Sequence, residues 1–248
     1  MKANRLKTVG LAVAGLVVML VNAPAAHAVA SLRLTSIAPD GSTQTITIVD
    51  GDALDTYKAI DGVITYHGTV GVWTINVTTG LTKPVSGSAS YPGMDLNTIN
   101  SNIGVQGAGD LIIEFSDTDF TASSWSSFVN AVGGTTSFTS GSLAFDTYYS
   151  TGNGLFETSL GTSQLITSQS FAIPGTKTVT EFAGSEHGGP VPSSSPFSLT
   201  IVATIHHDAA GVTSFDDFLT VPEGGSTLAL LGAGICLIGL SARGRERE

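Results

Sequence analysis

Short runs of β-branched and aromatic residues, broken by clusters of Gly, Pro, Asn, Asp and Ser, recur through the middle of this 248-residue chain. Such runs between turn-forming clusters predict β-strands. The predicted strands are Ser31–Ser36, Thr43–Val49, Gly62–Tyr66, Val70–Val77, Asp110–Phe115, Ser142–Tyr148, Gln164–Phe171, Thr178–Phe182, Phe197–His206 and Ser214–Leu219. Many short strands bury their apolar faces by packing sheet against sheet, so we expect an all-β antiparallel β-sandwich, with a jelly-roll arrangement as a variant.

Side-chain alternation is clearest in Val70–Val77 and in Phe197–His206, where every second residue from Phe197 to Ile205 is apolar. Only Ser124–Val132 has a helical spacing, with Trp125, Phe128, Val129 and Val132 on one side. We therefore predict one short helix among the strands.

The two ends differ from the middle of the chain. The middle part, Val29–Thr220, remains when Met1–Ala28 and Val221–Glu248 are removed. It has 192 residues, which is enough for one domain with a sizeable core. The only cysteine is Cys236, so the middle part has no disulfide framework, thiolate metal site or cysteine nucleophile. It carries four basic and 17 acidic residues, a net charge of −13 with His neutral. Such a surface repels phosphate, which excludes nucleic acid as a partner.

The N-terminus has the three parts of a secretory signal peptide. Basic residues at positions 2, 5 and 7 precede the apolar run Val9–Val21, which is too short to span a bilayer. Ala26 and Ala28 then form a small-x-small cleavage site. We predict that the mature chain begins at Val29.

The C-terminus also has three parts. A breaker-rich motif comes first, then the uncharged run Leu228–Leu240, then a basic end. The motif is Val221, Pro222, Glu223, Gly224, Gly225, Ser226 and Thr227, and the basic end holds Arg243, Arg245 and Arg247. A helix over 226–242 would rise about 25 Å, the lower edge of a membrane span, with the arginines cytoplasmic and the middle part outside.

This order of motif, short apolar helix and arginine cluster resembles the PEP-CTERM sorting signal of Gram-negative bacteria, in its VPDSG/VPDGGST form. The wording VPEGGSTLALLG carries the resemblance, with Gly224 where the commonest form has proline. The resemblance implies recognition by an exosortase-type processing enzyme. It also implies an inner-membrane precursor and delivery to the outer surface or the extracellular polysaccharide matrix. A plain membrane anchor without processing is the alternative.

Part of the middle, Thr45–Asp119, resembles the body of some uncharacterised PEP-CTERM proteins, in wording such as WTINVTTGLTKP and LIIEFSDTDF. That resemblance implies no activity. We expect a non-enzymatic secreted or cell-surface protein. The alternative is a glycan-binding or calcium-stabilised adhesion module, and a third class is an envelope hydrolase.

Candidate oxygen ligands for calcium are Asp50, Asp52 and Asp55, on a loop after a predicted strand. The EF-hand order is missing, and a solvated turn is the alternative interpretation. A second oxygen set is Asp110, Glu114, Asp117 and Asp119, and His206 shares a strand face with Asp208. We expect Asp216 and Asp217 on the surface, and we predict no cofactor apart from a calcium ion.

No G-x-S-x-G nucleophile elbow occurs, and nothing in the spacing of Glu114, Glu157 and Glu181 selects a catalytic pair, so we predict no catalytic residues. Exposed aromatic rings could stack on sugars, which makes extracellular polysaccharide a candidate partner. The candidate rings are Trp73, Tyr91, Trp125, Tyr148 and Tyr149. Their positions in strand patterns favour the core instead, most clearly for Trp73.

Overall fold

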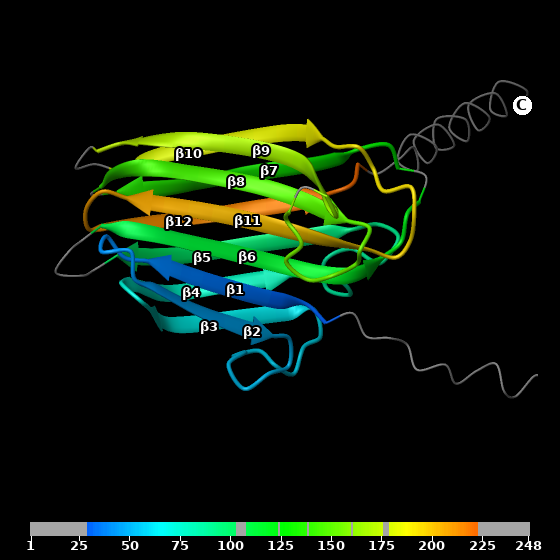
Figure 1. Ribbon diagram of the computed structural model, residues 1–248, viewed down its shortest axis with the longest axis horizontal. Helices are drawn as coiled ribbons and strands as arrows, with labels where there is room; N and C mark the ends of the chain where they lie inside the picture. The colour runs from blue at the N-terminus through cyan, green and yellow to red at the C-terminus, as the bar shows by residue number, and fades with distance from the viewer. Residues whose placement is uncertain are drawn as a thin grey trace, which may run out of the picture.

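The computed structural model describes residues 29–102, 108–123, 125–137, 139–159, 161–175 and 179–222, and in these ranges it contains strands and turns but no helix. The strands form two antiparallel sheets of six strands each (Figure 1). The predicted all-β, antiparallel class is therefore confirmed.

Sheet A has the order β2-β1-β6-β11-β8-β9 and sheet B the order β10-β7-β12-β5-β4-β3. The strands of sheet A are β1 Ser31–Ile37, β2 Thr43–Val49, β6 Gly109–Phe120, β8 Ser140–Ser150, β9 Ser163–Pro174 and β11 Phe197–His207. Those of sheet B are β3 Val63–Val70, β4 Trp73–Leu81, β5 Gly93–Asn102, β7 Phe128–Ser137, β10 Thr180–Gly188 and β12 Gly211–Thr220.

The apolar faces of the two sheets pack on one another to form one core. Phe145 on β8 lies 4.9 Å from Phe215 on β12 and 5.9 Å from Phe182 on β10, measured between ring centroids, so sheet A contacts sheet B directly. Figure 1 shows the same two layers. The sandwich follows from the period-two pattern, because one face of each central strand is apolar and must be covered.

Two sequence predictions within the sheets are wrong, and one strand was missed. The predicted helix Ser124–Val132 overlaps β7, where Phe128, Asn130 and Val132 are buried at every second position. The run Val70–Val77 is two strands, because the chain turns at Gly71, whose φ is +56°. The strand β5 was not predicted. In β7, a few apolar residues at spacings of three or four fit a helix as well as a strand. The segment is a strand because it pairs with both of its neighbours, β12 and β10.

The packing between the sheets is tight at Gly80 on β4. A Cβ there would lie 2.5–2.8 Å from three atoms of the fully buried Phe115 ring. We expect Gly80→Ala to lower the free energy of unfolding by about 1–3 kcal/mol, because the ring must move within a filled core. Urea denaturation measures this change. Gly133→Ala is the control, since its Cβ would meet nothing closer than 3.8 Å. Equal effects of the two substitutions would contradict the prediction.

Both ends of the described chain lie at the same end of the sandwich. Ser31 at the start of β1 is paired with Val49 and Ser116, and Thr220 at the end of β12 is paired with Gly93. In Figure 1 the first and the last described residues both lie on the right of the sandwich.

Most of the predicted sorting elements lie outside the described residues: positions 1–28, which hold Ala26 and Ala28, positions 223–227, the 226–242 helix and the three closing arginines. Of the motif, Val221 is buried and Pro222 half-buried. Among the residues described, no helix is long and apolar enough to cross a membrane.

Candidate functional site

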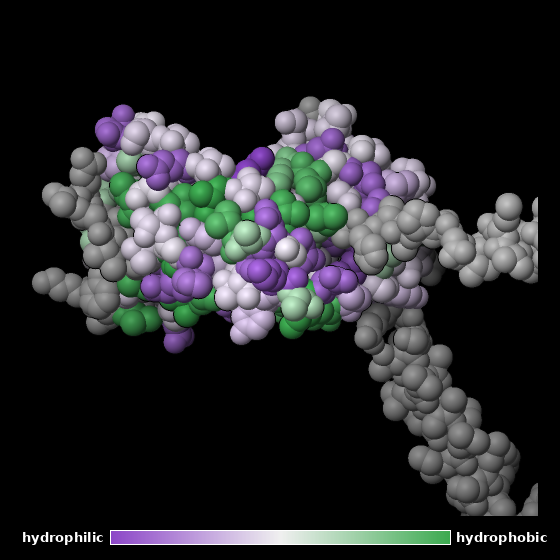
Figure 2. Space-filling model, turned by 90° about the horizontal axis from the view of Figure 1, so that it is seen from below, coloured by the Kyte–Doolittle hydropathy of each residue, from purple (hydrophilic) through white to green (hydrophobic). Residues whose placement is uncertain are grey.

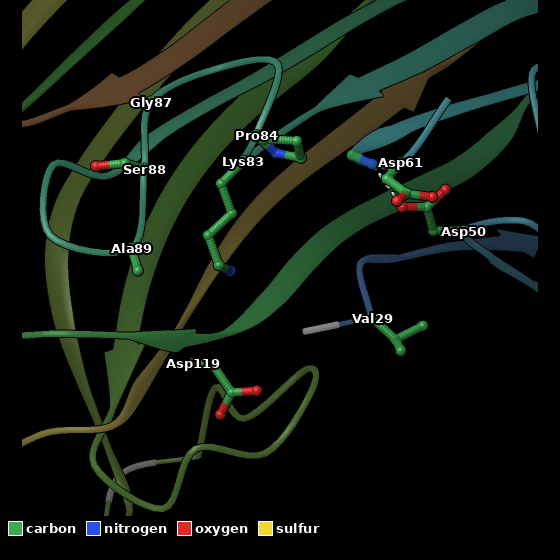
Figure 3. A pocket seen from close by; sticks show the side chains of 10 residues that line it. Val29, Asp50, Asp61, Lys83, Pro84, Gly87, Ser88, Ala89 and Asp119 are labelled. Carbon is green, nitrogen blue, oxygen red and sulfur yellow. Dashed lines mark hydrogen bonds between the residues drawn. The ribbon is translucent and has the colours of Figure 1, made fainter. Parts of the chain in front are cut away.

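A cavity of about 530 Å³ opens at the end of the sandwich where both termini lie. Its wall comes from the start of the chain, the β2–β3 loop (residues 50–62), the β4–β5 loop (residues 82–92) and the end of β6. The side chains that give it chemistry are Asp50, Asp61, Lys83, Ser88 and Asp119, with Val29 at the edge (Figure 3). We call this cavity the Lys83 pocket.

Lys83 is held firmly by β6. Its Nζ lies 2.6 Å from Asp117 Oδ2, donates to the carbonyl of Thr118, and sits 3.9 Å from the centre of the Phe120 ring. The Asp117 side chain is 1% exposed and also accepts from Thr82 Oγ1. An ammonium has three N–H donors, so one is not used by these two hydrogen bonds.

Asp119, near the end of β6, also lines the cavity (Figure 3). Its backbone is in the left-handed region, with φ of 60°. Asn153 holds it there by accepting from the Asp119 amide at 2.9 Å and donating to Asp119 Oδ1 at 2.7 Å. A non-glycine residue held in this strained conformation is a common feature of binding sites.

The β2–β3 loop is closed by its own carboxylates. Asp50 Oδ2 accepts from the Gly62 amide at 2.6 Å, and the buried Asp55 accepts from the amides of Gly51 and Thr65. Burial raises the pKa of Asp50, and the nearby carboxylates of Asp55, Asp61 and Asp117 raise it further.

The three predicted calcium ligands therefore hold the loop through amide hydrogen bonds. Asp50 and Asp55 are used as above, and the exposed Asp52 accepts from the next amide, that of Ala53. Within the described ranges, no group of three or more His, Cys, Asp or Glu side chains is placed to hold a metal ion.

The carboxylates of the second predicted set of oxygen ligands bind different partners and do not come together. Asp117 binds Lys83, Asp119 binds Asn153, and Glu114 forms two hydrogen bonds with Arg33, one of them at 2.6 Å. The fourth member, Asp110, lies near the opposite end of β6.

The predicted pairing of His206 with Asp208 is present, and Asp110 joins it. His206 Nδ1 lies 2.5 Å from Asp110 Oδ1, and Nε2 lies 3.0 Å from Asp208 Oδ1. Asp110 and then Asp208 raise the pKa of His206. The neighbouring His207 points into the core, where burial lowers its pKa to about 4 and its ring lies 4.7 Å from Trp73.

Among the candidate sugar-stacking rings, Trp73, Trp125 and Tyr149 are core residues. Tyr91 is 52% exposed and belongs to the same β4–β5 loop as Ser88. Sequence reasoning missed Lys83 as a site residue.

The surface around the β2–β3 side is mixed in character. Figure 2 views the molecule from below relative to Figure 1 and shows hydrophobic patches beside strongly hydrophilic ones. Large apolar side chains exposed in the β2–β3 loop are Leu54, Tyr57 and Ile60. The pocket is thus bordered by a loop that offers apolar as well as charged surface.

No protein-family model matches the sequence, and no curated protein matches it. Among solved structures, the enzymatically active domain of bacteriophage CBA120 tailspike protein 4 is similar, with a TM-score of 0.30, 13% identity, and coverage of 61% of this chain and 20% of that one. An isomalto-dextranase of Arthrobacter globiformis T6 complexed with panose has a TM-score of 0.24, 11% identity, and coverage of 63% and 23%. This chain spans less than a quarter of either protein, and likenesses at these TM-scores carry no argument about its function.

Proposed function

We propose that this chain is a non-enzymatic protein that is exported and sorted, by an exosortase-type enzyme acting on Val221–Glu248, to the outer surface or the extracellular polysaccharide matrix. The observation that carries the proposal is the order of proline-acid motif, apolar run and arginine cluster after the last strand.

Support comes from where the folded part begins and ends. β1 begins at Ser31, two residues after the proposed mature start at Val29, and β12 ends at Thr220, directly before the motif. A processing enzyme needs an accessible segment outside the folded domain. Val221 is still buried in the core, so this segment would begin at Pro222, which favours an extended conformation in the residue before it.

The test is the intact mass of the surface form of the protein. We expect a chain that starts at Val29 and lacks most of the last 28 residues. A variant that lacks residues 221–248 should be released from the cells at its full expected mass, because nothing remains for the enzyme to recognise. A full-length tail on the mature surface protein would contradict processing and leave membrane anchoring alone.

A second candidate function is adhesion through glycan binding, which the Lys83 pocket favours by bringing a donor and several acceptors into one cavity. If calcium stabilises the adhesion module, the melting temperature of the protein should rise when calcium is added. An unchanged melting temperature would contradict the calcium-stabilised form of this proposal.

A further inference from the structure

We propose that the Lys83 pocket binds a neutral sugar residue of a polysaccharide. The inference rests on the proposed glycan-binding function and names its site and ligand class. A cavity of about 530 Å³ falls within the usual range of small-molecule sites.

The hydrogen-bonding groups of Lys83 and Asp119 are complementary to hydroxyl groups. Lys83 has one N–H that its hydrogen bonds with Asp117 and Thr118 do not use, and Asp119 keeps acceptor capacity after its contact with Asn153. A sugar hydroxyl both donates and accepts, so neighbouring hydroxyls can use both groups at once.

Both groups are fixed before any ligand arrives. The Lys83 side chain is 12% exposed and is held by an ion pair, a carbonyl and an aromatic face. Asp119 is held by two hydrogen bonds with Asn153. Binding therefore requires little ordering of either side chain, which favours affinity.

Charge selects the class of sugar. The ammonium of Lys83 is already paired with Asp117, so the carboxylates of Asp50, Asp61 and Asp119 leave the pocket acidic. A uronic acid or sulfated sugar would be repelled. A neutral sugar meets no such repulsion.

The surroundings suit a polymer. Tyr91, half-exposed in the β4–β5 loop, offers a ring face of the kind that packs on the apolar face of a sugar. The pocket also lies at the end of the sandwich where β12 ends: Thr220 Oγ1 donates to the carbonyl of Pro92 in the same loop.

The experiment uses the full-length chain, purified in detergent, and isothermal titration with three hexasaccharide sets: neutral glucans of several linkages, oligogalacturonate and chitosan oligosaccharide. We expect a neutral glucan to bind and oligogalacturonate to bind at least roughly tenfold more weakly, because its carboxylates are repelled by the acidic pocket. Chitosan oligosaccharide, which the pocket does not repel, tests whether the site prefers a cationic sugar instead. Asp119→Asn should weaken the neutral glucan roughly tenfold, because a charge-assisted hydrogen bond is lost while the contact with Asn153 can persist. Asp52→Asn, in the exposed part of the β2–β3 loop, should leave binding within about twofold.

Binding of no neutral glucan, tighter binding of either charged oligosaccharide, or equal effects of Asp119→Asn and Asp52→Asn would overturn the proposal. A thermal melt of each variant checks that it is folded. The intact mass of the surface form distinguishes the two proposals: normal processing without sugar binding overturns only the pocket, and binding without processing overturns only the sorting.

Discussion

Lys83→Met is expected to lower the free energy of unfolding by about 3–5 kcal/mol, because it leaves Asp117 buried without its cation. The Asp117 side chain is 1% exposed. Two hydrogen bonds would remain to it, from Thr82 Oγ1 and the Thr118 amide, but neither supplies positive charge. Chemical denaturation followed by circular dichroism measures the loss.

The double variant Lys83→Met/Asp117→Asn is expected to recover a large part of that loss, since it removes the unpaired charge together with the cation. Lys58→Met is the matched control: Lys58 is exposed in the β2–β3 loop, and its change should stay within about 0.5 kcal/mol. A double variant no more stable than Lys83→Met would show that the ion pair is not what stabilises this end of the sandwich.

Asp217→Asn is expected to stabilise the protein at pH 8 and to have little effect at pH 4. Asp217 lies on the inner face of β12 and is 0% exposed. Its Oδ1 accepts from Asn130 Nδ2 at 2.5 Å, and Asn130 in turn accepts from Gln169 Nε2 on the opposite sheet at 2.7 Å. Oδ2 has no hydrogen-bond partner among the described residues.

The pKa of Asp217 is raised to about 7, mainly by burial and further by the charges of Asp216 and Asp95, while the Asn130 hydrogen bond opposes the rise. In the unfolded chain an aspartate has a pKa of about 3.9. The fold therefore binds the proton more tightly than the unfolded chain does. Stability is lost as the pH rises from about 4 to about 7, by an amount on the order of 4 kcal/mol for this one group.

Asn at position 217 carries no charge, so it removes this loss but places an amide N–H₂ where Oδ2 lacked a partner. We expect a net gain of about 2 kcal/mol at pH 8. Urea denaturation at pH 4, 6 and 8 measures this gain. The lowered pKa of His207 makes the protein less stable as the pH falls below about 6.5, which is the opposite trend. His207 is present in both proteins, so the difference in stability between variant and parent reports Asp217.

The control is Asp52→Asn, which removes an exposed acid and should change the free energy of unfolding by no more than about 0.5 kcal/mol. Asp95 also has a pKa raised to about 7, by burial and by its interaction with Asp216, and it adds a loss of the same sign. A variant that is less stable than the parent at every pH would contradict the account of Asp217 as a buried charge.

The alternation of apolar residues was enough to predict the class of fold and most of its strands. It was enough because side chains on a strand point to opposite faces in turn, so a half-buried strand leaves a period-two pattern in the sequence. β11 shows this directly: the predicted apolar face from Phe197 to Ile205 is the face found in the core. The pattern was not enough at β7, where the same few residues also fit a helix, or at Gly71, where a turn divides an alternating run.

The pocket could not be predicted in this way. Lys83 and Asp117 are 34 positions apart, and Asp119 and Asn153 are also 34 apart. Asp216 and Asp217 were both expected on the surface, and one of them is in the core. Neighbouring residues on a strand face opposite sides, so that prediction could have been corrected from the strand assignment alone.

The sequence by itself determined the β-sheet class, the acidic and cysteine-free middle part and the terminal motifs, because each of these is a property of residues that are neighbours in the chain. Only the tertiary structure decided which carboxylates are buried, which are tied to backbone amides, and which line a cavity with Lys83. Those outcomes depend on how two sheets bring distant loops to one end of the sandwich, and burial and the distance between charges exist only once that has happened.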